Sequence, residues 1–268
     1  MSKLGTKFWE VVGKVYGNRF YKAIDKAKGK SMGTYSPFIV SQLDALRGSD
    51  LGNFFGAETK KYYSQSGQDF FVDFIFGSKS EGVFLDIGGN DPVSINNTYW
   101  FEEKGWTGLA FEPLAEKNKL WAEKRKTPCL EIALGQEEKK VIFAKTAKDY
   151  LSKKYEGDFI KNAKTDSSES QIVETFEVQQ RRLSDVLDEY DMHEIDYISL
   201  DVEGAEMEVL QGIDWEKTLI KVLSIEAADD NKSNNAIRKY MISKGFMLLA
   251  RLTFDDIWVN RKVFKSKY

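Results

Sequence analysis

The sequence predicts an α/β fold built on a mostly parallel sheet. Three short runs dominated by apolar residues, over 82–87, 106–111 and 195–200, each contain or lead into an acidic residue. Runs of this kind are typical of strands that are buried on both faces of a parallel sheet. Glycines follow the first and third runs, which predicts tight loops at the carboxyl ends of the strands. Sheets of this type bind their ligands at that edge.

The composition allows one sizeable α/β domain and an appendage. The chain has 268 residues, of which 42% are hydrophobic and 13% aromatic, which is enough for a large core. We expect an N-terminal helical extension and linker over 1–60, and a main domain over 61–268 with a flexible insertion around 139–180. The single cysteine, Cys129, excludes an internal disulfide and a multi-cysteine metal site.

The charge is divided unevenly between the two parts of the chain. Residues 1–30 carry eight basic and two acidic side chains, whereas the whole chain has a net charge of −3. The body is therefore acidic, which argues against a nucleic-acid partner. Apolar residues recur at helical spacing within 1–30 and predict an amphipathic basic helix. This helix packs on the body or on a second copy, or it docks on an anionic membrane surface.

No segment resembles a membrane span or a secretory signal. No run approaches the ~20 apolar residues that a span requires, and the N-terminus lacks the apolar core of a signal peptide. We therefore expect a reducing, cytoplasmic setting, at the inner face of the membrane if the basic helix docks there.

The first strand, within 82–87, follows a helix and ends in a distinctive loop. Ser66 and Asp69 have the spacing of a helix cap before the apolar run 70–76. After the strand, the loop lacks the G-x-G-x-x-G spacing of dinucleotide-binding folds, because Pro92 follows the two glycines closely. The acid two residues before the glycines, Asp86, suits a ligand with a cationic amino-acid end beside a nucleoside, such as S-adenosylmethionine.

The second strand, 106–113, also ends in an acid. A short helix over 98–104 precedes the strand. Glu112 lies about 20–25 residues after the glycines, where nucleoside-binding α/β folds place the carboxylate that accepts both ribose hydroxyls. The alternative is that Glu112 only caps the helix 114–125. A third strand is expected over 127–134, beside the adenine.

The pattern changes within the insertion. Segments 141–145 and 172–179 have the alternation of hairpin strands, and the polar run 161–171 between them should be mobile. The insertion is either a lid or a passive surface loop.

A dense carboxylate cluster follows the next strand, 195–200. Asp201 and Glu203 come directly after it, and Glu226 ends the following strand, 219–225. Because these ends meet at one edge of the sheet, mutual repulsion calls for a catalytic base, a cationic ligand or a metal. The alternative is that they are solvated loop acids. The sole histidine, His193, precedes its strand and is expected at the opposite edge, away from catalysis.

The remaining segments complete the sheet. We expect a helix at 206–211, another at 235–244, and an antiparallel pair of strands at 246–252 and 255–260.

Taken together, the motifs resemble the FkbM family of S-adenosylmethionine-dependent methyltransferases. The resemblance runs from about residue 62 to 260 and rests on several ordered motifs. They are Ser64-Gln65-x-Gly67-Gln68-Asp69, Phe84-Leu85-Asp86-Ile87-Gly88, Gly105-Trp106-x-Gly108, Phe111-Glu112-Pro113, Arg182-Leu183-Ser184-Asp185, Ile195-Asp196-Tyr197 and Leu200-Asp201-Val202-Glu203-Gly204-Ala205-Glu206, with Glu226. The chain departs from the family at Gly89-Asn90-Asp91-Pro92, where Ala-Asn-x-Gly is usual, and it lacks a histidine near Glu226.

The resemblance implies a class I methyltransferase fold, which has a Rossmann-like seven-stranded sheet with an antiparallel last strand. It also implies a set of contacts to S-adenosylmethionine, with the acid of the first strand and the glycine loop at the methionine part. The expected cofactor-binding residues are Gln65, Asp86, Gly88, Gly89, Asn90, Glu112, Pro113, Ala133 and Asp201. Members commonly methylate a hydroxyl on a sugar of a glycan, glycolipid or natural product.

We therefore expect an O-methyltransferase that acts on a sugar or glycan acceptor. A neutral hydroxyl is a poor nucleophile, so Asp201, Glu203 or Glu226 would act as base, alone or through Mg²⁺ or Mn²⁺ held by the same three residues. Two alternatives stay open. One is an NAD-dependent sugar oxidoreductase on the same sheet, and the other is a non-catalytic glycan-binding module on a degenerate cofactor fold.

Overall fold

The computed structural model describes residues 62–146, 152–155, 172–227, 232–252 and 255–264. Contacts divide the chain into one unit of Met1–Lys60 with Asp73–Lys79, and a second of Lys61–Val72 with Ser80–Tyr268. In the first unit only 73–79 are described, the end of a helix and the turn after it. The second unit holds both sheets described below. The predicted basic helix within 1–30 and the linker to 60 lie outside the described residues.

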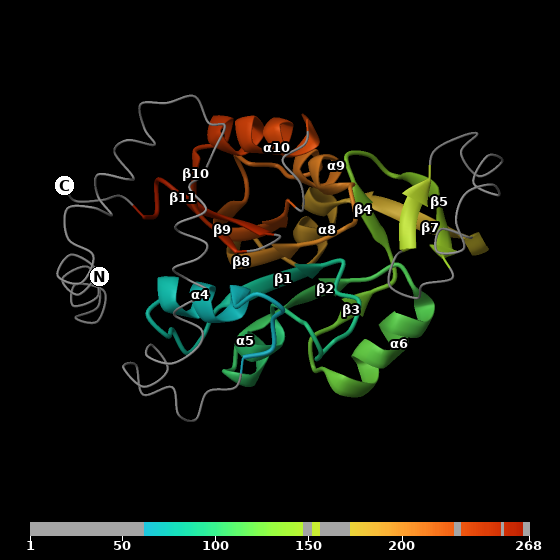
Figure 1. The fold of residues 1–268 in the computed structure, drawn as a ribbon, viewed down its shortest axis with the longest axis horizontal. Coiled ribbons are helices and arrows are strands. Elements are labelled where there is room, and N and C mark those ends of the chain that lie inside the picture. The colour runs from blue at the N-terminus through green and yellow to red at the C-terminus, as the bar shows by residue number, and fades with distance from the viewer. Residues whose placement is uncertain (1–61, 147–151, 156–171, 228–231, 253–254, 265–268) are drawn as a thin grey trace. The chain divides into compact units, whose positions relative to one another are not determined.

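The main sheet has seven strands in the order β10-β11-β9-β8-β1-β2-β3 (Figure 1). Their bounds are β1 Val83–Ile87, β2 Thr107–Phe111, β3 Cys129–Leu130, β8 Glu194–Leu200, β9 Leu219–Glu226, β10 Phe246–Leu252 and β11 Asp255–Asn260. Only β11 runs antiparallel to its neighbours, β9 and β10. This arrangement confirms the predicted Rossmann-like class I methyltransferase topology.

Helices cover both faces of this sheet. Figure 1 shows α5 and α6 on one side and α8, α9 and α10 on the other. The helices are α4 Gln68–Ile75, α5 Tyr99–Glu103, α6 Ala115–Lys124, α8 Leu183–Glu189, α9 Glu206–Gln211 and α10 Lys232–Ser243. None of the described helices is long and apolar enough to cross a membrane.

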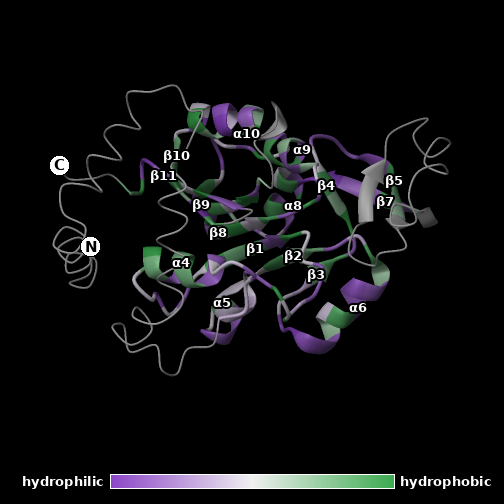
Figure 2. Ribbon diagram, in the orientation of Figure 1, coloured by the Kyte–Doolittle hydropathy of each residue, from purple (hydrophilic) through white to green (hydrophobic). Residues whose placement is uncertain are grey.

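The core lies between the sheet and these helices. The inner strands are buried on both faces, as Phe84 and Leu85 of β1 show, each with no exposed surface. Figure 2 shows the central strands in the green of apolar residues and much of the helical surface in purple. The apolar runs that predict the strands are therefore runs that must avoid water on two sides.

The expected third strand, 127–134, is split between two sheets. Its first part is β3, and its second part is β4 (Ala133–Gly135), which instead pairs in parallel with β7 (Ile172–Arg182). The prediction of one continuous strand was therefore wrong. Two residues separate β3 from β4, and the chain changes partner there, which an apolar pattern alone does not reveal.

The insertion forms a second sheet in the order β4-β7-β5-β6. The predicted hairpin strands are confirmed as β5 (Lys139–Thr146) and β7, which pair antiparallel and extend beyond the predicted bounds. The strand β6 (Ser152–Tyr155) pairs with β5 and was not predicted. The polar run 161–171 lies outside the described residues, so its role as a lid stays a prediction.

The entry to α4 differs from the predicted cap. The Asp69 carboxylate accepts hydrogen bonds from the backbone N–H groups of Tyr63 (2.6 Å) and Ser64 (3.1 Å), and from the Ser64 hydroxyl. At the start of α4, Asp69 thus bonds to residues that precede the helix, and Ser64 rather than Ser66 is its hydroxyl partner. This bonding fixes the segment that carries Gln65.

Candidate functional site

The carboxyl ends of β1, β2 and β8 meet at one edge of the main sheet. The ladder continues past β1, because Gly88 N donates to Phe111 O (2.9 Å) and Asp201 N donates to Ile87 O (3.0 Å). Gly88 has a φ of +84°, and a Cβ there would lie 1.7 Å from the Asp201 carbonyl oxygen. Only glycine allows the two loops to approach this closely.

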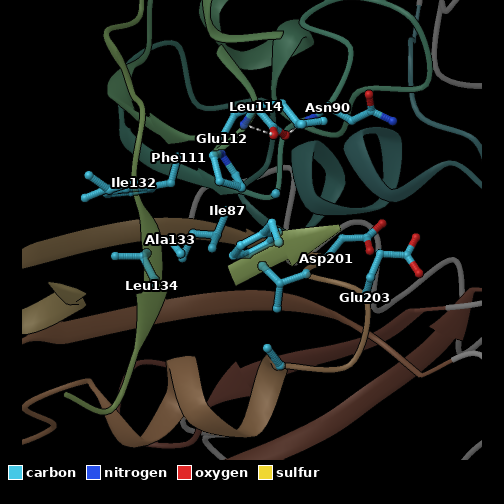
Figure 3. Close-up of a pocket in the computed structure, with 15 residues that line it drawn as sticks. Ile87, Asn90, Phe111, Glu112, Leu114, Ile132, Ala133, Leu134, Asp201 and Glu203 are labelled. Carbon is cyan, nitrogen blue, oxygen red and sulfur yellow. Dashed lines mark hydrogen bonds between the residues drawn. The ribbon is translucent and has the colours of Figure 1, made fainter. Parts of the chain in front are cut away.

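A pocket opens at this edge, and we call it the edge pocket (Figure 3). Six of the nine predicted cofactor-binding residues line it. Its lining is Ile87, Gly88, Asn90, Phe111, Glu112, Pro113, Leu114, Ile132, Ala133, Leu134, Phe143, Asp201, Val202, Glu203 and Ala205. The other three predicted residues, Gln65, Asp86 and Gly89, lie outside this lining.

Glu112 is the buried acid of the edge pocket. Its two carboxylate oxygens accept separate hydrogen bonds, from Asn90 N (3.0 Å) and Leu114 N (2.9 Å). Each oxygen keeps a further acceptor position for a ligand hydroxyl. Burial raises the pKa of Glu112 to about 7, because the charged form is poorly hydrated. Glu112 also has part of the alternative role, that of a helix cap, because the amide that it accepts from, Leu114 N, belongs to the N-cap residue of α6.

Apolar side chains form the rest of the edge pocket. Ile132, Leu134 and Phe143 line the cavity, and Figure 3 labels the first two. Ile132 directly precedes β4, and the other two residues lie in β4 and β5 of the second sheet. A pocket with a few placed polar groups and apolar walls suits a nucleoside. The residues present therefore fit the ribose and adenine of S-adenosylmethionine. That Glu112 accepts the ribose hydroxyls stays a prediction.

Asp86 bonds to the end of the loop that follows β1. Its buried carboxylate accepts hydrogen bonds from Asn96 Nδ2 (3.0 Å) and Thr98 Oγ1 (2.5 Å). Burial raises its pKa despite these bonds and the nearby Arg125 guanidinium. Because Asp86 alternates with Ile87 along β1, it faces away from the pocket that Ile87 lines. The methionine contact expected of it stays a prediction.

Gly89 serves the packing of the same loop. A Cβ on Gly89 would lie 2.5 Å from the Trp121 ring and 3.0 Å from Asp86 Oδ1. The loop can lie on α6 only because this position carries no side chain.

A second, polar pocket adjoins the edge pocket, and we call it the carboxylate pocket. Its lining is Gln65, Gln68, Ile95, Asn97, Asp201, Glu203, Glu226 and Asp255. Asp201 and Glu203 line both pockets. The structure thus brings together the three predicted catalytic carboxylates, and Gln65 lies with them rather than in the edge pocket.

The carboxylate pocket strongly perturbs its acids. Asp201 has exposed surface. Its carboxylate is nevertheless surrounded closely enough by protein that the charged form is poorly hydrated. Burial, and then the charge of Glu226, raise the pKa of Asp201; burial, and then the charge of Glu203, raise the pKa of Glu226. Carboxyls whose pKa values are raised in this way can take a proton from a ligand closer to neutral pH than a free carboxylate can.

Sequence reasoning missed three polar residues of this pocket, namely Gln68, Asn97 and Asp255, as well as Ile95. Asp255 lies directly opposite Glu226 in the pairing of β11 with β9. Its carboxylate accepts a hydrogen bond from Gln68 Nε2, and burial raises its pKa to about 6. The signal was present, because an antiparallel last strand that starts at 255 brings its first residue to the end of β9.

The assignment of Asp201, Glu203 and Glu226 as metal ligands stays a prediction. Among the described residues, no three His, Cys, Asp or Glu side chains are arranged to hold a metal ion. The neighbouring Glu206 is occupied by the backbone N–H groups of Val202 (3.3 Å) and Gly204 (2.9 Å). Glu206 therefore closes the turn after β8.

Two further predicted positions can be placed. His193 precedes β8, at the edge opposite the pockets, and its Nε2 lies 3.5 Å from an Asp191 oxygen. Pro92, which could have obstructed the glycine loop, is buried and lines neither pocket. The loop is thus open to a ligand despite its unusual sequence.

The model of the methyltransferase FkbM domain matches residues 86–248, more than half of the chain. No curated protein sequence matches this chain. Similar solved structures include a provisionally assigned O-methyltransferase from Klebsiella pneumoniae, with 11% identity over 84% of this chain and 97% of that chain and a TM-score of 0.40. The delta-N METTL16 MTase domain has 11% identity over 84% and 98%, with a TM-score of 0.36. The human methyltransferase 10 domain containing protein has 11% identity over 85% and 98%, with a TM-score of 0.35.

Proposed function

The chain belongs to the FkbM methyltransferase domain family, and on this premise we propose that it methylates a hydroxyl group, on a sugar of a glycan, glycolipid or glycosylated natural product. Family membership implies S-adenosylmethionine as the methyl donor. One observation carries the proposal, which is that Asp201 and Glu203 line both the edge pocket and the carboxylate pocket. A donor in one pocket and an acceptor in the other would meet at these residues.

The edge pocket would hold the cofactor through this chain's own residues. Glu112 would accept hydrogen bonds from the ribose hydroxyls, and the apolar wall around Ile132 and Leu134 would cover the adenine. Asn90 and Gly88 would face the methionine part. When bound, S-adenosylmethionine supplies a methyl group that is already activated by the sulfonium charge.

The carboxylate pocket would hold the acceptor and take its proton. The amides of Gln65 and Asn97 can donate to and accept from hydroxyl groups, as a polyhydroxylated ligand requires. The pair of Asp201 and Glu226 supports a base role, since its raised pKa values favour taking a proton near neutral pH. This pair would take the hydroxyl proton as the acceptor oxygen is methylated, and the electron pair of the broken carbon–sulfur bond would stay on sulfur.

Neither alternative function has an observation in its favour. A nicotinamide-dependent oxidoreductase would also use Glu112, but the matching family is one of methyltransferases. A degenerate binding module would be favoured by an obstructed loop, and Pro92 lies outside the lining of both pockets.

The experiment that tests the proposal is transfer of a labelled methyl group to a panel of glycosides and glycolipids. We expect transfer by the wild-type protein, and a loss of at least about tenfold in kcat for Glu226→Gln and Asp201→Asn, as for removal of a general base. The control is Glu216→Gln, an exposed acid before β9 at the opposite edge. Full activity of both pocket variants would refute the base role.

A chelator decides between the two forms of this mechanism. The described carboxylates form no metal site, and the base is proposed to act without a metal. We expect activity to survive removal of divalent cations. Loss of activity on chelation, with recovery on adding Mg²⁺ or Mn²⁺, would instead support the metal-assisted form.

A further inference from the structure

Arg125 is a buried guanidinium beneath the loop that follows β1. It lies just after α6, and its side chain has no exposed surface. Its Nε donates to Glu102 Oε2 (2.8 Å), which is itself nearly buried. Burying a charged group costs free energy unless it is fully paired, so the bonds that Arg125 makes must offset this cost.

The other guanidinium nitrogens of Arg125 hold the loop itself. Nη1 donates to the carbonyl oxygen of Pro92 (2.8 Å) and to Asn96 Oδ1 (3.3 Å), and Nη2 donates to Thr98 Oγ1 (3.3 Å). Asn96 and Thr98 in turn bond to Asp86. One planar group therefore ties together a loop that has no regular secondary structure of its own.

Aromatic rings fix the guanidinium in place. Its Cζ lies 4.5 Å from the centre of the Trp121 ring, 5.1 Å from that of Tyr99 and 5.7 Å from that of Phe84. Trp121 is one helical turn before Arg125, and the same indole packs against Gly89. The loop thus packs on two side chains at the end of α6. The Trp121 indole of the helix contacts Gly89, and the guanidinium of its C-cap residue bonds to Pro92 and Asn96.

The pocket-facing end of this loop is Asn90, whose N–H bonds to Glu112. We infer that Arg125 is a positioning residue for the cofactor, since it fixes residues 90–98 so that Asn90 and Glu112 face the edge pocket. The inference rests on the proposed function for the identity of the ligand. Lysine cannot replace arginine here, because a single ammonium group can neither reach all four acceptors nor stack as a plane on the aromatic rings.

The test compares Arg125→Lys with Arg238→Lys. Arg238 of α10 is also a buried arginine, and it pairs with Asp256 at 2.8 Å, but it lines neither pocket. Both variants should lose stability. Only Arg125→Lys should weaken the binding of S-adenosylhomocysteine in calorimetric titration, by about tenfold or more, well below its unfolding temperature. Equal affinity for wild-type protein and Arg125→Lys would overturn the inference.

A second readout does not depend on the cofactor. The amide resonance of Asn90 should move in the ¹H–¹⁵N spectrum of Arg125→Lys and stay in place in that of Arg238→Lys. If wild-type protein fails to bind S-adenosylhomocysteine, the proposed function falls, and an unmoved Asn90 amide would then overturn the positioning role as well.

A milder variant covers the case in which Arg125→Lys does not fold. Glu102→Gln removes the charge that faces Nε and leaves the guanidinium in place. It should lower the affinity for S-adenosylhomocysteine in the same direction but by less. An unchanged affinity and an unmoved Asn90 amide in Glu102→Gln would count against the inference.

Discussion

At the scale of single residues, Ile95 shows strain at the site. It has a φ of +55° and is 65% exposed, and it lines the carboxylate pocket. A β-branched residue rarely adopts this conformation. It persists because both flanks are fixed: Asp91 accepts from Val93 N (2.9 Å) on one side, and Asn96 accepts from Tyr99 N (2.8 Å) on the other.

Ile95→Gly should therefore stabilise the protein. Glycine adopts positive φ without strain, and little buried surface is lost with an exposed side chain, so we expect a gain of roughly 0.5–1 kcal/mol after the entropy cost of glycine in the unfolded chain. Denaturant unfolding measures it. Ile95→Ala is the control, because it removes most of the side chain and keeps the strain. A loss of stability in Ile95→Gly would show that the conformation is unstrained.

The paired acids predict how stability changes with pH. The pKa values of Asp201 and Glu226 are raised above their ordinary 3.8 and 4.5, chiefly by burial. The folded chain therefore binds more protons than the unfolded chain, and its stability falls as the pH rises above these ordinary values.

Glu226→Gln should reduce this pH dependence. Its free energy of unfolding should fall less than that of wild-type protein between about pH 5 and pH 8, because one of the repelling charges is gone. Urea unfolding at the two pH values measures the difference, with the exposed Glu216→Gln as control. Parallel pH profiles for wild type and Glu226→Gln would argue against the shifted pKa.

At the scale of elements, the junction of the loops after β1 and β8 depends on Gly88. A Cβ at Gly88 would meet the Asp201 carbonyl at 1.7 Å, whereas a Cβ at Gly204 would meet nothing within 4 Å, although both glycines have positive φ. The pair separates the effect of crowding from the effect of backbone strain.

Gly88→Ala should cost about 3 kcal/mol or more, since the loops must move apart, and Gly204→Ala about 1 kcal/mol from strain alone. Thermal unfolding of both variants, with S-adenosylhomocysteine titration, checks this. Equal losses in the two variants would mean that the close contact at Gly88 relaxes at no cost.

The strands that hold the site were predictable, and the reason is burial. β1, β8 and β9 are apolar on both faces, so their ends, and with them Asp201, Glu203 and Glu226, follow from the pattern. The division of 127–134 between β3 and β4 was not predictable, because which sheet a strand joins depends on partners far along the chain. Arg125 required knowledge of what α6 packs against, whereas the position of Asp255 follows from an antiparallel last strand that begins at 255.

At the scale of the whole molecule, the fold brings two pockets together at the carboxyl edge of one sheet. The predicted seven-stranded sheet with its antiparallel last strand was correct, because several motifs along one domain agreed on the same topology. The same motifs indicate the FkbM family, whose domain model matches residues 86–248. They could not identify the acceptor, because specificity lies in side chains that only the folded chain places side by side.

The central claim is that Glu112 and the edge pocket bind S-adenosylmethionine. The most direct measurement is calorimetric titration with S-adenosylhomocysteine and, in parallel, with NAD⁺, on wild-type protein, on Glu112→Ala and on the exposed control Glu131→Ala. We predict that wild type and Glu131→Ala bind S-adenosylhomocysteine and not NAD⁺, and that Glu112→Ala binds at least about tenfold more weakly, as expected when two hydrogen bonds to a carboxylate are lost. Binding of NAD⁺ alone, or undiminished binding by Glu112→Ala, would contradict the account.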